Sequence, residues 1–243
     1  MTQPHTKMLY CVGNSHIAAV RAAAEQSGAA VTFVHATEAY ILNDEGALAL
    51  KPDVVAMLQE TTGPIFSMVG GNAHNNFGII QQGPAMDFIH PRHPHLSNNS
   101  TAMRLPYQLV RDAVEQRASV WPAVFTALCQ LAPGRIIHFE SPPPIANEQF
   151  LVKRLRGRFR ARGLDNIKIN PPTLRYKLWQ TNSDIYRDLC ARHGQVFVPS
   201  PEVAQTSMGF LAYSYWNDPT HANQAYGALV LQRMEEFASA PSV

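Results

Sequence analysis

The sequence of 243 residues lacks the features that mark several large classes of protein. Its 20 basic and 18 acidic side chains leave a net charge of +2, which is too near neutral for a general polyanion binder, so no nucleic-acid partner is expected. No apolar run reaches the length of a membrane span, which argues against stable membrane insertion. No N-terminal segment combines a basic start, an apolar core and a cleavage site, and the sequence therefore predicts a cytoplasmic protein.

Cysteine is also scarce. Only Cys11, Cys129 and Cys190 occur, an odd and widely spaced set. Each lies in an apolar strand or helix pattern. We therefore expect buried thiols rather than a disulfide framework or a metal cluster.

What the chain does contain is an alternation of short apolar runs and helical patterns, with no internal repeat or low-complexity linker. A single domain spanning residues 1–243 is therefore expected. Strand, helix and strand in repetition predict an α/β fold with a five-stranded parallel sheet covered on both faces and the active site at the carboxyl ends of the strands. The predicted strands are Met8–Val12, Ala30–His35, Pro64–Val69, Arg135–Glu140 and Gln195–Val198. The predicted helices are Ile17–Gln26, Asp53–Glu60, Tyr107–Leu131, Leu174–His193 and Ala222–Ala238.

Residues 70–104 interrupt this alternation. The segment is long, polar and rich in Asn, His and Pro, and it leaves the sheet at the end of the third strand, so we expect it to lie over the active site. Within it, His90, His93 and His95 are close enough to suggest Zn²⁺, but their spacing matches no established ligand pattern and no metal is predicted. Contact with substrate or ordinary loop packing are the other interpretations.

The basic run Lys153–Arg162 is the only concentrated charge in the chain. A solvated face is the ordinary interpretation of such a run. Contact with an anionic substrate, a phosphorylated acyl carrier or a membrane surface is the alternative.

A serine follows the first predicted strand, and an acid and a histidine precede the last predicted helix. Ser15 lies between the first strand and its helix, where its own N–H is placed to stabilise a developing oxyanion. Asp218 and His221 lie three residues apart, just before the last helix, so that the carboxylate can reach the histidine ring. An imidazole that removes the serine proton, oriented by a carboxylate, turns the hydroxyl into a nucleophile.

An asparagine follows the third strand. Gly70 and Gly71 allow a sharp turn there, after which Asn72 can offer its side-chain NH₂ to a substrate oxygen. The alternative is an asparagine that satisfies only loop backbone.

In these segments the chain resembles the SGNH (GDSL-type) hydrolase superfamily. The stretch 13–16 is similar to the first block of the family, which carries the serine nucleophile; the stretch 70–75 is similar to the third block, and 218–221 to the last. The resemblance implies a flavodoxin-like three-layer α/β/α sandwich, with Ser15, Asp218 and His221 as the catalytic residues. It also implies an oxyanion hole formed by Ser15 and Asn72.

The resemblance has two departures. Asn14 stands where the family usually has Asp, next to the nucleophile but outside the triad. The second-block glycine has no clear match, and Gly46 is assigned to the oxyanion hole as its best candidate. His16, His74 and Trp216 are the candidate substrate contacts. The alternatives are that the two histidines cap helices and that Trp216 packs in the core or the wall.

The resemblance implies a serine esterase that cleaves carboxylic esters, such as acetyl or other short-chain acyl esters, through an acyl-enzyme intermediate and without a cofactor. The partner would be a small-molecule or carbohydrate ester, and a lipid or aryl ester also fits the sequence. The alternatives are an acyltransferase to a carbohydrate hydroxyl and a non-catalytic binding domain of the same fold.

Overall fold

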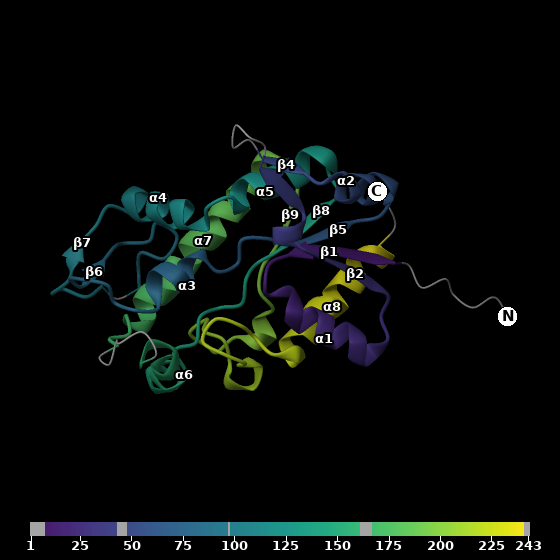
Figure 1. Ribbon diagram of the computed structural model, residues 1–243. Helices are drawn as coiled ribbons and strands as arrows, with labels where there is room; N and C mark the ends of the chain where they lie inside the picture. Colours follow the sequence, from purple (N-terminus) through teal and green to yellow (C-terminus); the bar gives the residue numbers. More distant parts are fainter. Residues whose placement is uncertain (1–7, 43–47, 97, 161–166, 241–243) are drawn as a thin grey trace.

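A parallel sheet forms the centre of the computed structural model, which describes residues 8–42, 48–96, 98–160 and 167–240 (Figure 1). The strands lie in the order β2-β1-β5-β8-β9, and neighbouring strands are parallel throughout. This is the strand order of a flavodoxin-like fold. The strands are β1 (Leu9–Gly13), β2 (Val31–His35), β5 (Ile65–Met68), β8 (Ile136–Phe139) and β9 (Val196–Val198). Each begins and ends within one residue of its predicted run, so the predicted sheet is confirmed.

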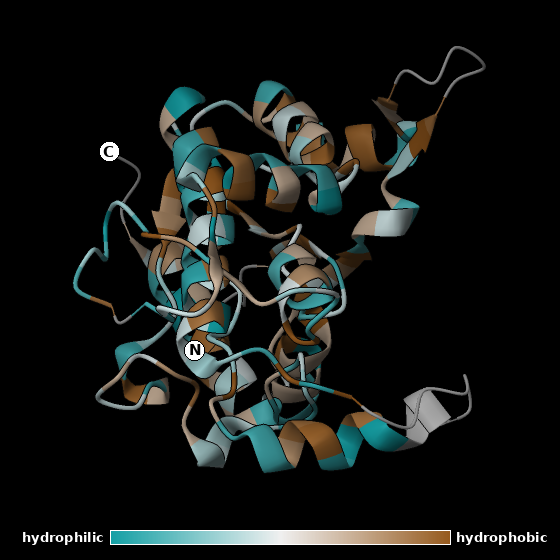
Figure 2. Cartoon of the chain, turned by 90° about the vertical axis from the view of Figure 1, so that its left-hand side faces the viewer, coloured by the Kyte–Doolittle hydropathy of each residue, from teal (hydrophilic) through white to brown (hydrophobic). Residues whose placement is uncertain are grey.

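Helices cover both faces of this sheet and give the three predicted layers. Helices α1 and α8 pack together on one face, in a core that includes Cys11, whereas α2, α5 and α7 cover the other face around Val12. Adjacent residues of β1 enter different cores because side chains alternate along a strand. Figure 2 shows hydrophobic and hydrophilic residues interspersed on the same helices, as expected for helices with one face on a core. The bounds are α1 (Ile17–Ser27), α2 (Pro52–Glu60), α5 (Trp121–Leu131), α7 (Pro172–Arg192) and α8 (Gln224–Ser239).

The predicted single helix over Tyr107–Leu131 is wrong. The segment forms two helices, α4 (Tyr107–Ala118) and α5, separated at Ser119, which adopts a positive φ of 57°. Pro122, in the first turn of α5, has no N–H to donate to the Ala118 carbonyl, and its ring would clash with that carbonyl in a continuous helix. This proline was the sequence signal for the break.

The segment 70–104 has more structure than its sequence predicted. It contains the helix α3 (Ala73–Gly78) and the paired short strands β6 (Met86–Asp87) and β7 (Met103–Arg104). A buried ion pair joins it to α7, because the Lys177 ammonium lies 2.5 Å from the Asp87 carboxylate. The expectation that this segment covers the active site stays a prediction.

The remaining elements are short or were not predicted. The basic run begins in α6 (Glu148–Arg160), but Ala161 and Arg162 lie outside the described residues. A hairpin of β3 (Tyr40–Leu42) and β4 (Leu48–Leu50) follows β2, and one-turn 3₁₀ helices span Ala36–Glu38, Glu202–Ala204 and Tyr213–Tyr215.

All three cysteines are buried and free, as predicted. Burial raises the pKa of each thiol to about 12, so these side chains are inert packing groups at neutral pH. Of the helices that the structure describes, none has the length and apolarity needed to cross a membrane.

Candidate active site

Ser15 lies on a tight turn between β1 and α1. The N–H groups of Ile17 and Ala18 donate to the carbonyls of Asn14 and Ser15 at 3.1 Å, which starts the helix just after the serine. The turn requires glycine at position 13, because a Cβ there would lie 2.5 Å from Ile17 Cγ2. The Ser15 side chain is exposed, and its N–H has no hydrogen-bond partner in the described part of the chain. Both groups are therefore available to a substrate.

His221 and Asp218 complete a hydrogen-bonded chain with this serine. His221 Nε2 lies 2.7 Å from Ser15 Oγ, and His221 Nδ1 lies 2.9 Å from Asp218 Oδ2. The ring is thus bonded through both nitrogens, with the carboxylate on the side away from the serine. This arrangement allows the imidazole to accept the serine proton while the carboxylate fixes its tautomer.

Asp218 is held in its ionised form by the loop that carries it. Its Oδ1 accepts hydrogen bonds from the backbone N–H groups of Thr220 at 2.8 Å and His221 at 2.9 Å. Burial opposes ionisation of the carboxyl. The hydrogen bonds from His221 and the Thr220 N–H outweigh burial and hold the pKa of Asp218 well below its usual range. The carboxylate is consequently charged whenever the protein is near neutral pH.

Asn72 lies at the end of the β5–α3 turn, as the first residue before α3. The side chain of Asn75 donates to its Oδ1 at 2.8 Å, which occupies the acceptor end of the Asn72 amide and leaves its NH₂ as a donor. Asn14 fixes the same turn from the other side, since its Oδ1 accepts from the Gly70 N–H at 2.6 Å. The oxyanion role of Asn72 stays a prediction. Gly46, the other candidate donor, lies outside the described residues.

The candidate substrate contacts differ in exposure. His16 and His74 are buried, with 4% and 2% of their surfaces exposed, while Trp216 is partly exposed. Burial, together with His221, lowers the pKa of His16 to about 4, so this imidazole is neutral at physiological pH. The indole of Trp216 packs at 4.9 Å from the Phe150 ring of α6, which places α6 beside the loop of Asp218. Contact of these three residues with substrate stays a prediction.

An open pocket of about 370 Å³ lies between α1 and the loop of His221. Three alanines of α1 form part of its wall, and Asn217 and Gln224 add amide groups. Ser15 and His221 lie at its surface. Its lining combines small apolar side chains with a few polar groups; the alanines are Ala18, Ala19 and Ala22.

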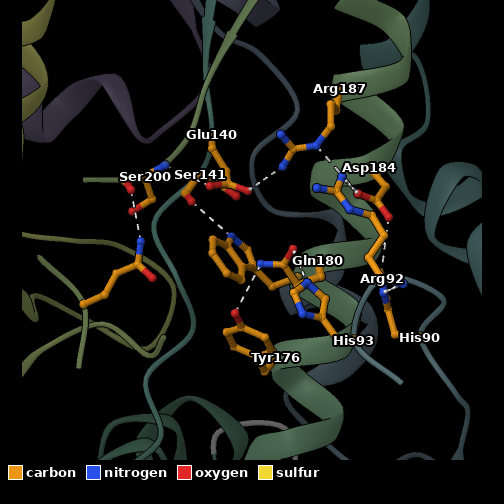
Figure 3. A network of polar contacts seen from close by, with 12 residues as sticks. His90, Arg92, His93, Glu140, Ser141, Tyr176, Gln180, Asp184, Arg187 and Ser200 are labelled. Atoms are coloured by element: carbon orange, nitrogen blue, oxygen red, sulfur yellow. Dashed lines mark hydrogen bonds and ion pairs between the residues drawn. The ribbon is translucent and has the colours of Figure 1, made fainter. Parts of the chain in front are cut away.

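His90 and His93 of the 70–104 segment lie against α7. His90 Nε2 is 3.5 Å from Asp184 Oδ2, and His93 Nε2 is 3.1 Å from Gln180 Oε1 (Figure 3). In the described ranges, no group of three or more histidine, cysteine or acidic side chains is placed to hold a metal ion. His90 and His93 thus pack against a helix.

Sequence reasoning missed the two residues that fix the site's loops. From the sequence, Asn14 is only a departure from the family pattern, but in the structure its side-chain oxygen accepts from the Gly70 N–H and so fixes the β5–α3 turn. Thr220 was not predicted to matter, although its N–H and its hydroxyl both donate to Asp218 Oδ1, at 2.8 and 3.2 Å. The sequence carried a signal for this contact, because an Asp or Asn side chain often accepts a hydrogen bond from the backbone N–H two residues later, in an Asx turn.

Neither a family model nor a curated protein matches the sequence. The solved structures with which the chain aligns include GDSL-like lipases, acylhydrolases and esterases. A GDSL-like lipase from Bacteroides thetaiotaomicron is 12% identical over 97% of this chain and 92% of its own, with a TM-score of 0.43. The aryl esterase of M. smegmatis is 11% identical over 95% and 99%, with a TM-score of 0.43. A carbohydrate acetylesterase from Sinorhizobium meliloti is 11% identical over 96% and 99%, with a TM-score of 0.41. Likeness at this level supports no inference about activity.

Proposed function

We propose that this protein is a serine esterase that hydrolyses carboxylic esters with a short acyl group. The observation that carries the proposal is the chain of hydrogen bonds from an exposed Ser15 through His221 to Asp218, with 2.7 Å between Ser15 Oγ and His221 Nε2. An isolated serine hydroxyl is a weak nucleophile, and a histidine in this position is what activates it.

In the first half-reaction, Ser15 Oγ attacks the acyl carbon while its proton moves to His221 Nε2. The carbonyl oxygen becomes an oxyanion, to which the Ser15 N–H and the Asn72 NH₂ donate. One donor of this type contributes on the order of 3 kcal/mol to the tetrahedral intermediate. The C–O bond to the alcohol then breaks, and the proton on His221 passes to the departing alkoxide. Ser15 is left acylated.

In the second half-reaction, His221 takes a proton from water as the water oxygen attacks the acyl carbon. Collapse of the new intermediate returns the proton to Ser15 Oγ and releases the carboxylic acid. Asp218 stays ionised throughout and stabilises the imidazolium that forms in both steps. These steps use only the side chains named and water.

The pocket beside Ser15 supports a short acyl group. Alanines of α1 provide a small apolar wall, against which an apolar group of methyl size can pack. Acetyl is the simplest group of this kind.

The test is hydrolysis of p-nitrophenyl acetate by the wild type and by Ser15→Ala. The variant should lose all detectable turnover and labelling by a fluorophosphonate, because both need the hydroxyl. Ser27→Ala is the matched control, since Ser27 lies at the other end of α1 and its hydroxyl donates to the Ala24 carbonyl. An unchanged rate in Ser15→Ala removes the nucleophile from the proposal. A wild-type protein that fails to label is instead a binding domain, and acetylation of an added sugar identifies a transferase.

A further inference from the structure

A small cavity with both apolar and polar side chains in its wall lies beside the β5–α3 turn. His16 contributes to its wall, together with Ser141 after β8 and Asn182 and Tyr186 of α7. These side chains are 4%, 7%, 3% and 2% exposed, so the cavity is deep inside the protein. About 10 Å³ is open to the centre of a water-sized sphere, which is room for about one water molecule.

Several polar atoms of the cavity wall are unsatisfied by the protein, whereas His138 and Glu140, also in the wall, have partners. Both ring nitrogens of His16, Ser141 Oγ, Asn182 Oδ1 and Tyr186 Oη have no hydrogen-bond partner of good geometry within the described residues; the Gly71 backbone lies beside the His16 ring and acts to raise its pKa. Buried polar atoms are nearly always hydrogen-bonded, and a buried water molecule makes about three such bonds. The set contains hydroxyl donors, an amide acceptor and a neutral imidazole with one donor and one acceptor nitrogen. Such a set matches the hydrogen-bonding capacity of water.

The charged groups near the cavity already have partners, which argues for a neutral ligand. Glu140 accepts from the Ser200 N–H at 2.8 Å and lies 4.0 Å from Arg187, and Arg187 lies 3.8 Å from Asp184 (Figure 3). Arg92 also donates to Asp184, at 2.8 Å. The unpaired atoms of the cavity wall are therefore on neutral side chains, which suit water better than an ion; Arg187 Nε also lacks a hydrogen bond, but Arg187 is not part of the wall.

His16 connects the cavity to the catalytic residues. It forms part of the wall of both the cavity and the pocket of Ser15, and its ring centroid lies 5.1 Å from that of His221. It also touches the turn before Asn72, since a Cβ at Gly71 would lie 2.3 Å from His16 Cδ2. A rotation of this ring would displace the turn or press on His221.

We propose that the cavity binds one ordered water molecule, which hydrogen-bonds His16 to Ser141, Asn182 or Tyr186 and so makes His16 a positioning residue for His221 and the Gly71–Asn72 turn. The catalytic part of this inference rests on the proposed esterase function, and the water site does not.

A crystal structure at about 1.2 Å resolution tests the water site without any variant. We expect a well-ordered water within hydrogen-bond distance of a His16 ring nitrogen and of at least one of the other three side chains. Density that shows no water in contact with His16 overturns the inference, whatever the activity of the protein.

The positioning role is tested with the double variant Ser141→Ala/Asn182→Leu, which removes two polar atoms from the cavity. We expect kcat on p-nitrophenyl acetate to fall about tenfold, with KM within twofold of wild type. This loss is smaller than the roughly 100-fold loss of rate that a 1 Å misplacement of the reacting groups causes. Thr181→Val is the matched control, because its buried hydroxyl lies on the same helix but donates to the Lys177 carbonyl at 2.9 Å.

A double variant whose kcat equals that of the control overturns the positioning role. If it fails to fold, single Tyr186→Phe with the same readouts replaces it. If the wild type hydrolyses no ester, the esterase proposal fails, and the crystallographic water alone then decides the inference.

Discussion

Replacing Asp218 with Asn changes the chemistry of the candidate site while preserving most of its hydrogen bonds. Asp218 Oδ1 accepts from two backbone N–H groups, at 2.8 and 2.9 Å, and Asn retains an oxygen that can do the same. The Asn NH₂ then takes the place of Oδ2, 2.9 Å from His221 Nδ1. An NH₂ can only donate, which favours His221 Nδ1 as its acceptor, in competition with the retained oxygen, which lies 3.0 Å from Nδ1 and can accept from it.

The consequence falls on the other side of the ring. With Nδ1 unprotonated, a neutral His221 carries its proton on Nε2, which faces Ser15 Oγ at 2.7 Å and can no longer accept the serine proton. The same substitution in the serine protease triad lowers kcat about 10⁴-fold. The Asp218 side chain is 43% exposed, so solvent stabilises some of the imidazolium in the variant. We therefore expect a fall of about 10²- to 10³-fold, equivalent to about 3–4 kcal/mol of transition-state stabilisation.

Steady-state hydrolysis of p-nitrophenyl acetate measures this effect, with circular dichroism to confirm the fold. Asp112→Asn is the matched control, because Asp112 is an exposed carboxylate on α4 that accepts a hydrogen bond from Gln108. A folded Asp218→Asn protein with kcat within threefold of wild type would refute the argument that the carboxylate sets the tautomer of His221.

Three further predictions concern stability and the turn beside Ser15. Lys177→Met should lower the free energy of unfolding by about 3–5 kcal/mol in urea titrations, because it leaves the buried Asp87 carboxylate without its ion-pair partner. Adding Asp87→Asn should restore most of this stability, and a double variant whose loss equals the sum of the two single losses would contradict the argument. Burial lowers the pKa of His138 to about 3, so below pH 6.5 the unfolded chain binds a proton that the folded chain does not. Stability is therefore lost as the pH falls, by roughly 2 kcal/mol at pH 5 from this residue, and urea unfolding of His138→Asn should lack that part of the pH dependence. Asn14→Ala removes the acceptor of the Gly70 N–H and should lower kcat about tenfold, whereas Asn14→Asp should retain activity; equal rates would show that the turn needs no such bond.

Part of the fold was beyond local sequence patterns for identifiable reasons. The β5–α3 turn and the segment after it have no hydrophobic periodicity because polar groups fix them to α7, as the Asp87–Lys177 pair does. The break between α4 and α5 was hidden by the apolar pattern, which continues unchanged through Ser119, and only Pro122 signals it. Gly71 was expected to allow a turn, but the structure gives a stronger reason, since His16 occupies the space that a side chain would need.

The sequence by itself determined the sheet, because short apolar runs separated by helical patterns have few other ways to bury their side chains. It also determined that Ser15 and Asn72 would lie at the same edge, since the carboxyl ends of parallel strands meet there, whereas the family resemblance alone implied that Asp218 and His221 join them. Only the tertiary structure decided the 2.7 Å approach of His221 to Ser15, across 206 residues of sequence, because such a distance depends on how α1 and α8 pack. It alone also decided that His16, next to Ser15, is buried between the pocket of Ser15 and an internal cavity, because burial follows from contacts between distant segments.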